Sequence, residues 1–317
     1  MPAAFTIVGL GEALFDIFPD RQTLGGATLN AAVHAHQLAA ARAQAGRGVV
    51  VSRVGQDDLG QRLLADLARR GMTTEFVQTD PDLDTGKVYV NVGDAGDPRF
   101  DIVTDVAWDK LQYDPDIEQL AQRCEAVCFG TLAQRDGQAR YTIQRFLSAA
   151  GRAVRLCDVN LRQEFYDQRI LRRSFELANV VKLNRAELEK VSGLLGLSAR
   201  ADNGGGDEAM DRQALAVLGG YRHLKLLAVT RGARGTVFYE QGKAGRQEQE
   251  PVRYPPALGA DAVGAGDACT AGLLLGLVLR WPLERTLQLA NHLGAFVASQ
   301  PGGTPALPPA ILDMARG

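Results

Sequence analysis

The chain alternates short apolar segments with amphipathic helical stretches along nearly its whole length. Several short segments, such as Ala126–Phe129 and Leu226–Thr230, are continuously apolar, which is typical of strands buried on both faces of a parallel sheet. The expected strands are Phe5–Val8, Gly48–Arg53, Lys87–Val92, Ala126–Phe129, Val154–Asp158, Val180–Leu183, Leu226–Thr230 and Thr236–Tyr239. Because alternating strands and helices place helices on both faces of a sheet, the sequence predicts a three-layer α/β/α fold with a mostly parallel central sheet.

The helices expected between these strands are Thr28–Ala43, Gly60–Arg70, Gln138–Ala150, Arg185–Leu194, Asp211–Gly219, Gly266–Leu279 and Leu283–Ser299. Polar, Gly-containing segments at 198–209 and 241–250 are expected to be surface loops. Residues 12–24 and 86–106 break the alternation, since they contain strands and turns without the helix that a parallel crossover requires. We expect these two segments to pair as a small antiparallel lid inserted into one domain that spans residues 1–317.

The charge balance excludes two classes of partner. The 317 residues include 35 basic and 37 acidic side chains, for a net charge of −2, which leaves no basic footprint for nucleic acid or an anionic membrane.

The longest apolar run, from Ala268 to Val278, is shorter than the ~20 residues of a membrane span. The N-terminal segment lacks the basic start of a signal peptide. The sequence therefore predicts a cytoplasmic protein.

Cysteine and histidine give no sign of a metal site. The four cysteines (Cys124, Cys128, Cys157, Cys269) are too few and scattered for a disulfide scaffold, and no pair has CxxC spacing. We expect them to be buried, reduced thiols. His34 and His36 are two residues apart on an expected helix, so they face different sides. All four histidines, with His223 and His292, are expected to be structural.

The strongest local signal for chemistry is the segment DAVGAGD at residues 261–267, which precedes an apolar helix. Small residues ahead of a helix leave backbone N–H groups unpaired, and the helix dipole adds positive potential, so this is a cradle for phosphate. Asp267 lies at its mouth, where the dipole should keep it ionised and able to accept a proton from a hydroxyl. Alternatively, Asp267 is an ordinary helix N-terminal acid after a glycine turn.

A second glycine-rich segment, LGGATLN at residues 24–30, also opens a helix. Gly25 and Gly26 would let a ligand approach the backbone, with Asn30 on the same side one turn later. The alternative is a plain turn before an Ala-rich helix. The sequence contains no GxxxxGK[ST] loop, and Gly9-Leu10-Gly11 lacks the third glycine of a dinucleotide site, so a nicotinamide-dependent oxidoreductase is weakly supported.

Six segments, in order along nearly the whole chain, resemble motifs of the PfkB (ribokinase-like) carbohydrate kinases. They are LGGATLNAA at 24–32, RVGQDDLG at 53–60, DVNLR at 158–162, KLNRAE at 182–187, TRGARG at 230–235 and DAVGAGD at 261–267. Any one of them would be weak alone, but six in order make a chance resemblance very improbable. DVNLR, the opening GEALFDIFP and DVAWD at 105–109 look like the fructokinase branch of this family.

The resemblance implies a β lid over the sugar and transfer of the ATP γ-phosphate to a sugar hydroxyl. Such transfer needs positioning and charge stabilisation more than covalent chemistry. Asp267 would be the base, and the amides of Gly264, Ala265 and Gly266 would form the anion hole. The sugar contacts implied are Asp16, Gly25, Gly26, Asn30, Arg99 from the lid and Arg162, which could instead contact a phosphate. Arg99 and Arg162 also remain plausible as ordinary exposed arginines.

The resemblance also implies a nucleotide and its cations. The nucleotide contacts implied are Asn160, Asn184, Thr230, Gly232, Gly235 and Asn291, the last of which could also be an ordinary helix residue. Glu187 would hold Mg²⁺ through water. Asp261 and carbonyls near residues 302–303 would hold K⁺, although Ala262 stands where the family has a threonine. Homodimers that pair through the lid are expected.

Several functions remain open from the sequence. Fructose is the first substrate expected, and 2-keto-3-deoxygluconate is the nearest alternative. Other sugars or nucleosides, such as ribose and adenosine, are more distant alternatives, since Ala27 stands where ribokinases have a lysine. Outside this class, the chain could be a regulator that binds sugar or nucleotide without chemistry. An intact Asp267 and GAG segment argue against a regulator, since a non-catalytic protein has no need of the base.

Overall fold

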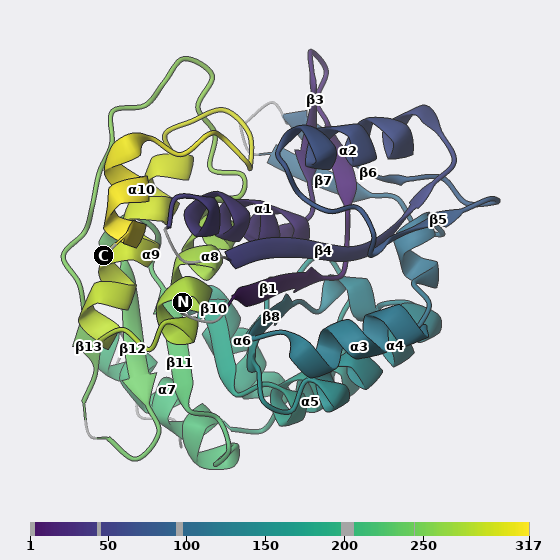
Figure 1. The fold of residues 1–317 in the computed structure, drawn as a ribbon. Helices are drawn as coiled ribbons and strands as arrows, with labels where there is room; N and C mark the ends of the chain where they lie inside the picture. Colours follow the sequence, from purple (N-terminus) through teal and green to yellow (C-terminus); the bar gives the residue numbers. More distant parts are fainter. Residues whose placement is uncertain (1–3, 43–45, 93–97, 198–205, 244, 317) are drawn as a thin grey trace.

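The fold was analysed in a computed structural model that describes residues 4–42, 46–92, 98–197, 206–243 and 245–316, without the side chains of 91, 92 and 98–100. A nine-stranded sheet has the order β13-β12-β11-β10-β9-β8-β1-β4-β5, and a four-stranded sheet has the order β3-β2-β6-β7 (Figure 1). The strands of the large sheet are β1 (Phe5–Leu10), β4 (Gly46–Gly55), β5 (Val77–Asp80), β8 (Ala126–Phe129), β9 (Val154–Asp158), β10 (Val180–Asn184), β11 (Leu226–Thr230), β12 (Thr236–Glu240) and β13 (Gln247–Glu248).

The large sheet is mostly parallel, as the apolar segments predicted. The seven strands from β11 to β5 pair in parallel, whereas β12 runs antiparallel to β11 and β13 antiparallel to β12. The short strand β13 lies inside the segment 241–250 that was expected to be a loop. The predicted α/β class with a mostly parallel sheet is therefore confirmed.

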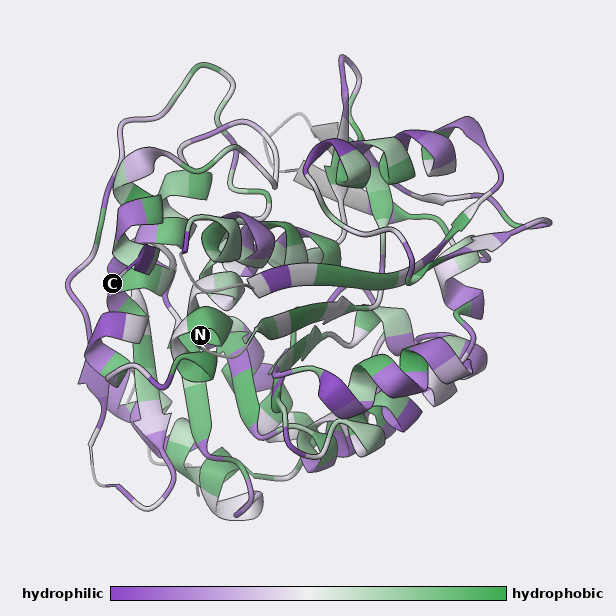
Figure 2. Cartoon of the chain, in the orientation of Figure 1, coloured by the Kyte–Doolittle hydropathy of each residue, from purple (hydrophilic) through white to green (hydrophobic). Residues whose placement is uncertain are grey.

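Helices cover both faces of this sheet (Figure 1). They are α1 (Ala27–Ala40), α2 (Asp58–Arg69), α3 (Pro115–Arg123), α4 (Gly137–Ala149), α5 (Gln168–Leu177), α6 (Arg185–Leu194), α7 (Asp207–Gly220), α8 (Ala265–Val278), α9 (Leu283–Val297) and α10 (Pro309–Arg316). Neighbouring side chains of β1 enter different cores. Ile7 belongs to a cluster with side chains of α1, α8, α9 and α10, and Val8 belongs to a cluster with side chains of α3 to α7. Figure 2 shows the central strands as mainly apolar, which agrees with burial on both faces.

Three of these helices, α3, α5 and α10, were not predicted. Their sequences do carry helix signals: Asp114 accepts a hydrogen bond from the Ile117 amide at 2.8 Å to cap α3, with Pro115 in its first turn. Similarly, Asp167 caps α5 through the Ile170 amide at 2.7 Å. The parallel neighbours β9 and β10 need a crossover connection, and α5 supplies it.

The lid differs from the antiparallel flap expected for residues 12–24 and 86–106. Its strands are β2 (Leu14–Ile17), β3 (Gln22–Gly25), β6 (Gly86–Val92) and β7 (Pro98–Ile102). Strands β2 and β3 form one antiparallel hairpin and β6 and β7 form another, but β2 and β6 pair in parallel. The chain between the two hairpins runs through α1, β4, α2 and β5, so the main body supplies the long crossover that parallel pairing needs.

The order of the large sheet reverses between β8 and β1, since the chain proceeds from β1 to β4 on one side and from β8 to β9 on the other. In open α/β sheets, ligands bind beyond the carboxyl ends of strands at such a reversal. The carboxyl ends of β1, β9, β10 and β11 lead into four of the segments singled out from the sequence, at 11–16, 159–162, 184–187 and 230–235. The fold therefore gathers these segments at one edge.

Several features lie outside this edge. All four cysteines are buried free thiols. None of the helices in the described ranges is long and apolar enough to cross a membrane, and these ranges hold no group of three His, Cys, Asp or Glu side chains suited to a metal. The histidines bond to the protein itself; His223, for example, contacts the Phe175 carbonyl through Nε2 at 2.8 Å.

Candidate active site

A cavity of about 880 Å³ lies between the lid and the start of α8. Its walls include most of the residues that the sequence assigned to sugar and phosphate: Asp16, Gly26, Asn30, Asn160, Arg162, Asn184, Glu187, Thr230, Asp261, Gly264, Gly266 and Asp267. Residues that are far apart in the sequence thus line one space. Arg99 lies in β7, but its side chain is outside the described residues.

A second cavity, of about 680 Å³, adjoins the first through Thr230, Ala262 and Gly266, which line both. It contains Gly232, Gly235 and Asn291. The Asn291 side-chain nitrogen is buried without a hydrogen-bond partner in the described chain. A methyl group on Gly235, which has φ of 76°, would lie 3.0 Å from this nitrogen. The second cavity therefore presents an unused donor, which suits the heteroaromatic acceptors of a nucleotide base.

The N-terminus of α8 forms the junction between the cavities. Its N-cap, Gly264, has φ of 76° and provides no side-chain cap, and a methyl group there would lie 2.5 Å from the Gly303 Cα. Only glycine fits this position. The Ala265 amide makes a 3.4 Å hydrogen bond to the Ala262 carbonyl, whereas Gly264 and Gly266 line the large cavity. This geometry makes the helix start accessible to an anion.

Asp267 lies half-buried in the first turn of α8, and Asn30 Nδ2 donates to its Oδ2 at 2.8 Å. Burial raises the pKa of Asp267 to about 6, and the charge of Asp158 adds to this, while the Asn30 hydrogen bond, Lys182 and Arg162 lower it. The sequence predicts that the helix dipole keeps the Asp267 carboxyl ionised. Desolvation favours the protonated form instead, and its effect on the pKa is the larger one. A carboxylate with a pKa near the working pH is well matched to accept a hydroxyl proton.

A buried ion pair lies beneath this helix start. Lys182 of β10 and Asp158 of β9 are register partners, and Lys182 Nζ lies 2.8 Å from Asp158 Oδ2. The Thr270 hydroxyl donates to the same oxygen at 2.7 Å. Burial acts to lower the pKa of Lys182, but the neighbouring Asp158 carboxylate outweighs it and raises the pKa above its ordinary value. Lys182 therefore stays charged at the cavity wall.

Two further carboxyl groups face Asp267 from the strand β1 exit and the lid. Burial raises the pKa of Glu12 to about 7 and that of Asp16 to about 7, and the charge of Asp267 contributes to both shifts. Glu12 Oε1 accepts the Ala27 amide at 3.0 Å, while its Oε2 is buried without a partner in the described chain. The cavity therefore concentrates acceptors that a polyhydroxyl ligand would satisfy.

The glycines at 25 and 26 are required by the close approach of this part of the chain. A methyl group on Gly25 would lie 2.4 Å from Asp16 Oδ2. Gly26 has φ of 107°, and a methyl group there would lie 2.5 Å from the Glu12 carbonyl oxygen. Gly26 lines the cavity, and Gly25 lies behind the Asp16 carboxylate. Their assignment as sugar contacts stays a prediction.

We expect Asp16→Asn to stabilise the folded protein and to weaken sugar binding. Folding raises the pKa of Asp16 from 3.8 to about 7, so the folded state holds this proton more tightly and loses stability as pH rises from about 4 through 7. The neutral amide avoids that loss, which is of the order of 1–3 kcal/mol. Thermal unfolding between pH 5 and 9 should show a higher Tm for the variant at pH 8, and a smaller difference at pH 5.

The matched control is Asp101→Asn, which changes an exposed lid carboxylate and should leave Tm and sugar KM unchanged. A Tm for Asp16→Asn below that of the unchanged protein at pH 8 would show that burial does not penalise the Asp16 charge.

Asn184 and Glu187 have a clear local role at the start of α6. Asn184 Oδ1 accepts the Glu187 amide at 2.9 Å, and Glu187 Oε2 accepts the Asn184 amide at 2.8 Å, which is a capping box. Glu187 Oε1 also accepts the Leu161 amide at 2.9 Å. The box therefore fixes the loop that carries Asn160, a residue with φ of 41°, and Arg162. In addition to this capping role, the side chains of Asn184 and Glu187 line the large cavity.

Among the cavity residues that were not assigned from the sequence are Glu12, Arg21 and Lys182. Asp158, the ion-pair partner of Lys182, was not assigned either. Lys182 carried a signal, because a lysine between Val181 and Leu183 in an apolar strand needs a buried partner. Glu12 likewise lies in an apolar segment. Arg21 gave no local signal, since its partner Asp261 is 240 residues away.

The comparisons with known proteins agree with this geometry. Residues 18–310 match the pfkB family carbohydrate kinases. A fructokinase of Vibrio alginolyticus is 28% identical over 319 residues, which cover 94% of each chain.

Two solved structures share the fold. A fructokinase from Xylella fastidiosa with bound ATP has a TM-score of 0.79 at 22% identity, covering 98% of this chain and 97% of its own. A double-mutant fructokinase from Vibrio cholerae O395, with fructose, ADP and a potassium ion, has a TM-score of 0.77 at 24% identity, also covering 98% and 97%. Because the family match covers most of the chain, this protein belongs to the pfkB family of carbohydrate kinases and is an ATP-dependent carbohydrate kinase.

Proposed function

We propose that this kinase phosphorylates a small ketose, with fructose as the first candidate. The observation that carries the catalytic part is the position of Asp267, which lies at the start of α8 where the two cavities meet and is oriented by Asn30. The choice of fructose rests on the DVNLR and GEALFDIFP segments and on the 28% identity to a fructokinase.

In the proposed reaction, the base of ATP occupies the smaller cavity and the phosphates cross at Gly264 and Gly266 toward the larger one. Asp267 accepts the proton of the attacking hydroxyl. The amides at the start of α8 stabilise the negative charge on the transferring phosphoryl group. The Lys182 charge at the cavity wall contributes in the same direction.

Mg²⁺ is expected with ATP, where it neutralises phosphate charge. Glu187 fits an indirect role, because both of its oxygens already accept backbone amides. A carboxylate oxygen so engaged keeps one lone-pair direction for a metal-bound water, and Mg²⁺ retains most of its waters in proteins. We therefore assign Glu187 to water-mediated contact rather than direct ligation.

For the sugar, the proposed contacts are Asp16 and Asn30. The Asn30 Oδ1 atom is buried and unpartnered within the described chain, so it can accept a hydroxyl while Nδ2 holds Asp267. Asp16 can accept two hydroxyl hydrogen bonds. Asn30 would thus both bind the sugar through Oδ1 and orient the catalytic base Asp267 through Nδ2.

A second candidate is a substrate with an apolar or aromatic portion, such as a nucleoside. The lid strands line the large cavity with buried aliphatic side chains, namely Leu14, Val88, Val90 and Ile102, and Leu132 adds another from the segment after β8. Such a surface packs against a flat heterocycle better than against hydroxyl groups. This observation favours a nucleoside over an acidic sugar among the alternatives.

The test is ADP release with Mg·ATP over fructose, 2-keto-3-deoxygluconate, ribose, adenosine and fructose 1-phosphate. We expect fructose to give the highest kcat/KM. A preference for adenosine would identify the apolar lid as the selective surface. Nucleotide binding without turnover on any member would instead favour the regulator.

Assembly through the lid is a further expectation. The edge strands of the lid sheet are β3 and β7, and an unpaired strand edge is a natural pairing surface. Sedimentation should give a homodimer; a monomer at all concentrations would reject it.

A further inference from the structure

The Asp261 carboxylate joins three separate segments of the chain. Its Oδ1 accepts the Val263 amide at 3.0 Å, in the loop that leads to the anion hole. Its Oδ2 accepts the Gly302 amide at 3.1 Å, in the loop after α9. The same Oδ2 lies 3.3 Å from Arg21 Nη2, in the turn between lid strands β2 and β3. One side chain therefore ties the lid to both loops around the helix start.

This donor set does not fit the potassium ion implied for Asp261 by the family resemblance. Potassium is held by several oxygens that together replace its water shell. Here Asp261 Oδ2 accepts the Gly302 amide and also lies 3.3 Å from Arg21 Nη2, so the lone-pair direction that the amide leaves free is taken by the guanidinium. Oδ1 accepts the Val263 amide, residue 262 is alanine and supplies no hydroxyl, and the Gly303 carbonyl contacts His34 Nε2 at 2.9 Å. The Arg21 charge also lies at the oxygen where the ion would sit, and like charges repel.

The Arg21 guanidinium is held at this position from several sides. Its Nη1 lies 3.3 Å from Asp20 Oδ1, and its central carbon lies 4.0 Å from the centroid of the Phe18 ring. The backbone closes the same turn, since the Phe18 amide donates to the Arg21 carbonyl at 2.8 Å. A planar guanidinium stacked on an aromatic ring loses less freedom when it pairs with a carboxylate.

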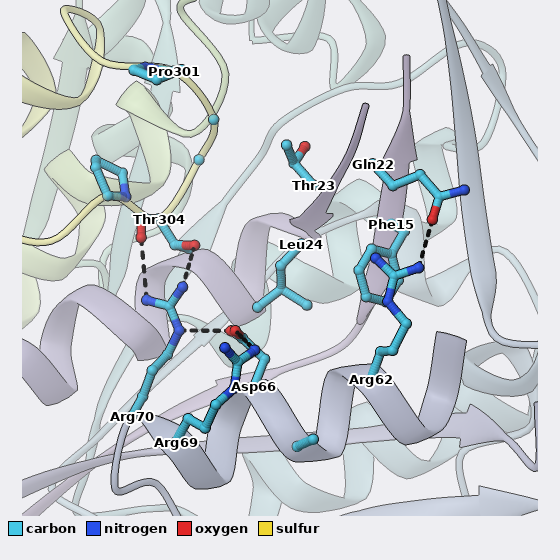
Figure 3. Close-up of a pocket in the computed structure, with 14 residues that line it drawn as sticks. Phe15, Gln22, Thr23, Leu24, Arg62, Asp66, Arg69, Arg70, Pro301 and Thr304 are labelled. Atoms are coloured by element: carbon cyan, nitrogen blue, oxygen red, sulfur yellow. Dashed lines mark hydrogen bonds and ion pairs between the residues drawn. The ribbon is translucent and has the colours of Figure 1, made fainter. Parts of the chain in front are cut away.

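The loop that receives Asp261 is fixed on its other side as well. Arg70, at the end of α2, donates to the Thr304 carbonyl at 3.2 Å and to the Thr304 hydroxyl at 3.3 Å, and Asp66 orients its guanidinium (Figure 3). The loop at 300–304 is thus held at Gly302 by the Asp261 carboxylate and at Thr304 by the Arg70 guanidinium. This loop sets the position of Gly303 against Gly264 at the anion hole.

We propose that the Arg21 guanidinium replaces the monovalent cation in this kinase and couples the lid to the anion hole. Arg21 supplies a positive charge to Asp261 when the lid hairpin is in place, and Asp261 then holds the loops at 263 and 302 in register with the start of α8. Arg21 is a positioning residue that acts through Asp261, and turnover does not require potassium. This inference rests on the proposed kinase reaction but not on the identity of the sugar.

The first experiment compares turnover and ADP affinity in potassium chloride and in tetramethylammonium chloride at equal ionic strength. The unchanged protein should give the same kcat within about twofold in both salts. Arg21→Ala should lower kcat by about tenfold or more, since misplacing a reacting group by 1 Å can cost a hundredfold. ADP affinity, measured by calorimetry, should fall in the same variant, and Arg21→Lys should keep part of both.

Two further variants separate this role from general stabilisation of the lid. Arg62→Ala removes a guanidinium that donates to the side chain of the lid residue Gln22 at 2.7 Å (Figure 3), and it should leave kcat and ADP affinity unchanged in both salts. The double variant Arg21→Ala with Ala262→Thr removes the guanidinium and supplies a hydroxyl. It should regain rate and ADP affinity in potassium chloride but not in tetramethylammonium chloride.

Potassium-dependent turnover of the unchanged protein would overturn the inference. So would an Arg21→Ala variant that matches the unchanged protein, or a double variant that responds equally to both salts. If no sugar supports turnover, the proposed function fails, but calorimetry with ADP still decides the role of Arg21.

Discussion

Asp267→Asn should lower kcat by about 10²–10⁴-fold, the range that a positioned general base contributes. The amide has nearly the same size, and its oxygen can still accept the 2.8 Å hydrogen bond from Asn30. What it cannot do is take the proton of the sugar hydroxyl. Because the variant also removes a desolvated, half-buried charge near Asp158, we expect ATP binding to be retained and Tm to be unchanged or higher.

The measurement is steady-state ADP release with the best sugar, together with calorimetric binding of an ATP analogue. Asp58→Asn is a matched control, because Asp58 is also an acidic residue in the first turn of a helix but is exposed at the start of α2. It should change kcat by less than about twofold, in line with the ~0.3–1 kcal/mol of an exposed helix-terminal charge.

The same pair of variants decides between the two interpretations of Asp267. If it were only a helix N-terminal acid, both substitutions would have small effects of similar size. A base with the pKa of about 6 that burial gives Asp267 also predicts that kcat/KM falls below pH 6 in the unchanged protein. That fall should be absent from the residual activity of Asp267→Asn.

Lys182→Met should lower both stability and activity. It leaves the Asp158 carboxylate, 7% exposed in its side chain, without its ion-pair partner at 2.8 Å. Removing one member of a buried pair costs about 3–5 kcal/mol, because the remaining charge stays desolvated. The urea concentration at the unfolding midpoint should therefore fall clearly, and kcat should fall with the loss of positive charge at the cavity wall.

A double variant separates these two effects. Lys182→Met combined with Asp158→Asn removes both charges, and the new amide oxygen can still accept the Thr270 hydroxyl that now bonds to Asp158 at 2.7 Å. Its unfolding midpoint should return toward that of the unchanged protein while kcat stays low. Lys225→Met, which changes an exposed lysine just before β11, is the control. A single variant as stable as the unchanged protein would contradict the energetic importance of the pair.

The sequence was a good guide wherever the signal was local. Strands Ala126–Phe129, Val154–Asp158 and Leu226–Thr230 were predicted with their observed bounds. In Ala126–Phe129 and most of Leu226–Thr230 the local signal is a continuous apolar run, which in a parallel sheet is itself the reason for burial. Errors arose where pairing depends on distant segments. The parallel contact of β2 with β6 in the lid joins strands separated by the main body of the fold, which no local pattern encodes.

The sequence alone determined the alternation of strands and helices, the six family motifs and many of the polar residues that line the cavity. Only the tertiary structure decided their chemical state. Asn30 meets Asp267 across 237 residues, and Arg21 meets Asp261 across 240. Burial, which depends on what all other segments cover, turns the dipole-stabilised acid expected at Asp267 into one with a raised pKa. Periodicity and motifs are properties of neighbouring residues, whereas desolvation and ion pairing are properties of the whole packed chain.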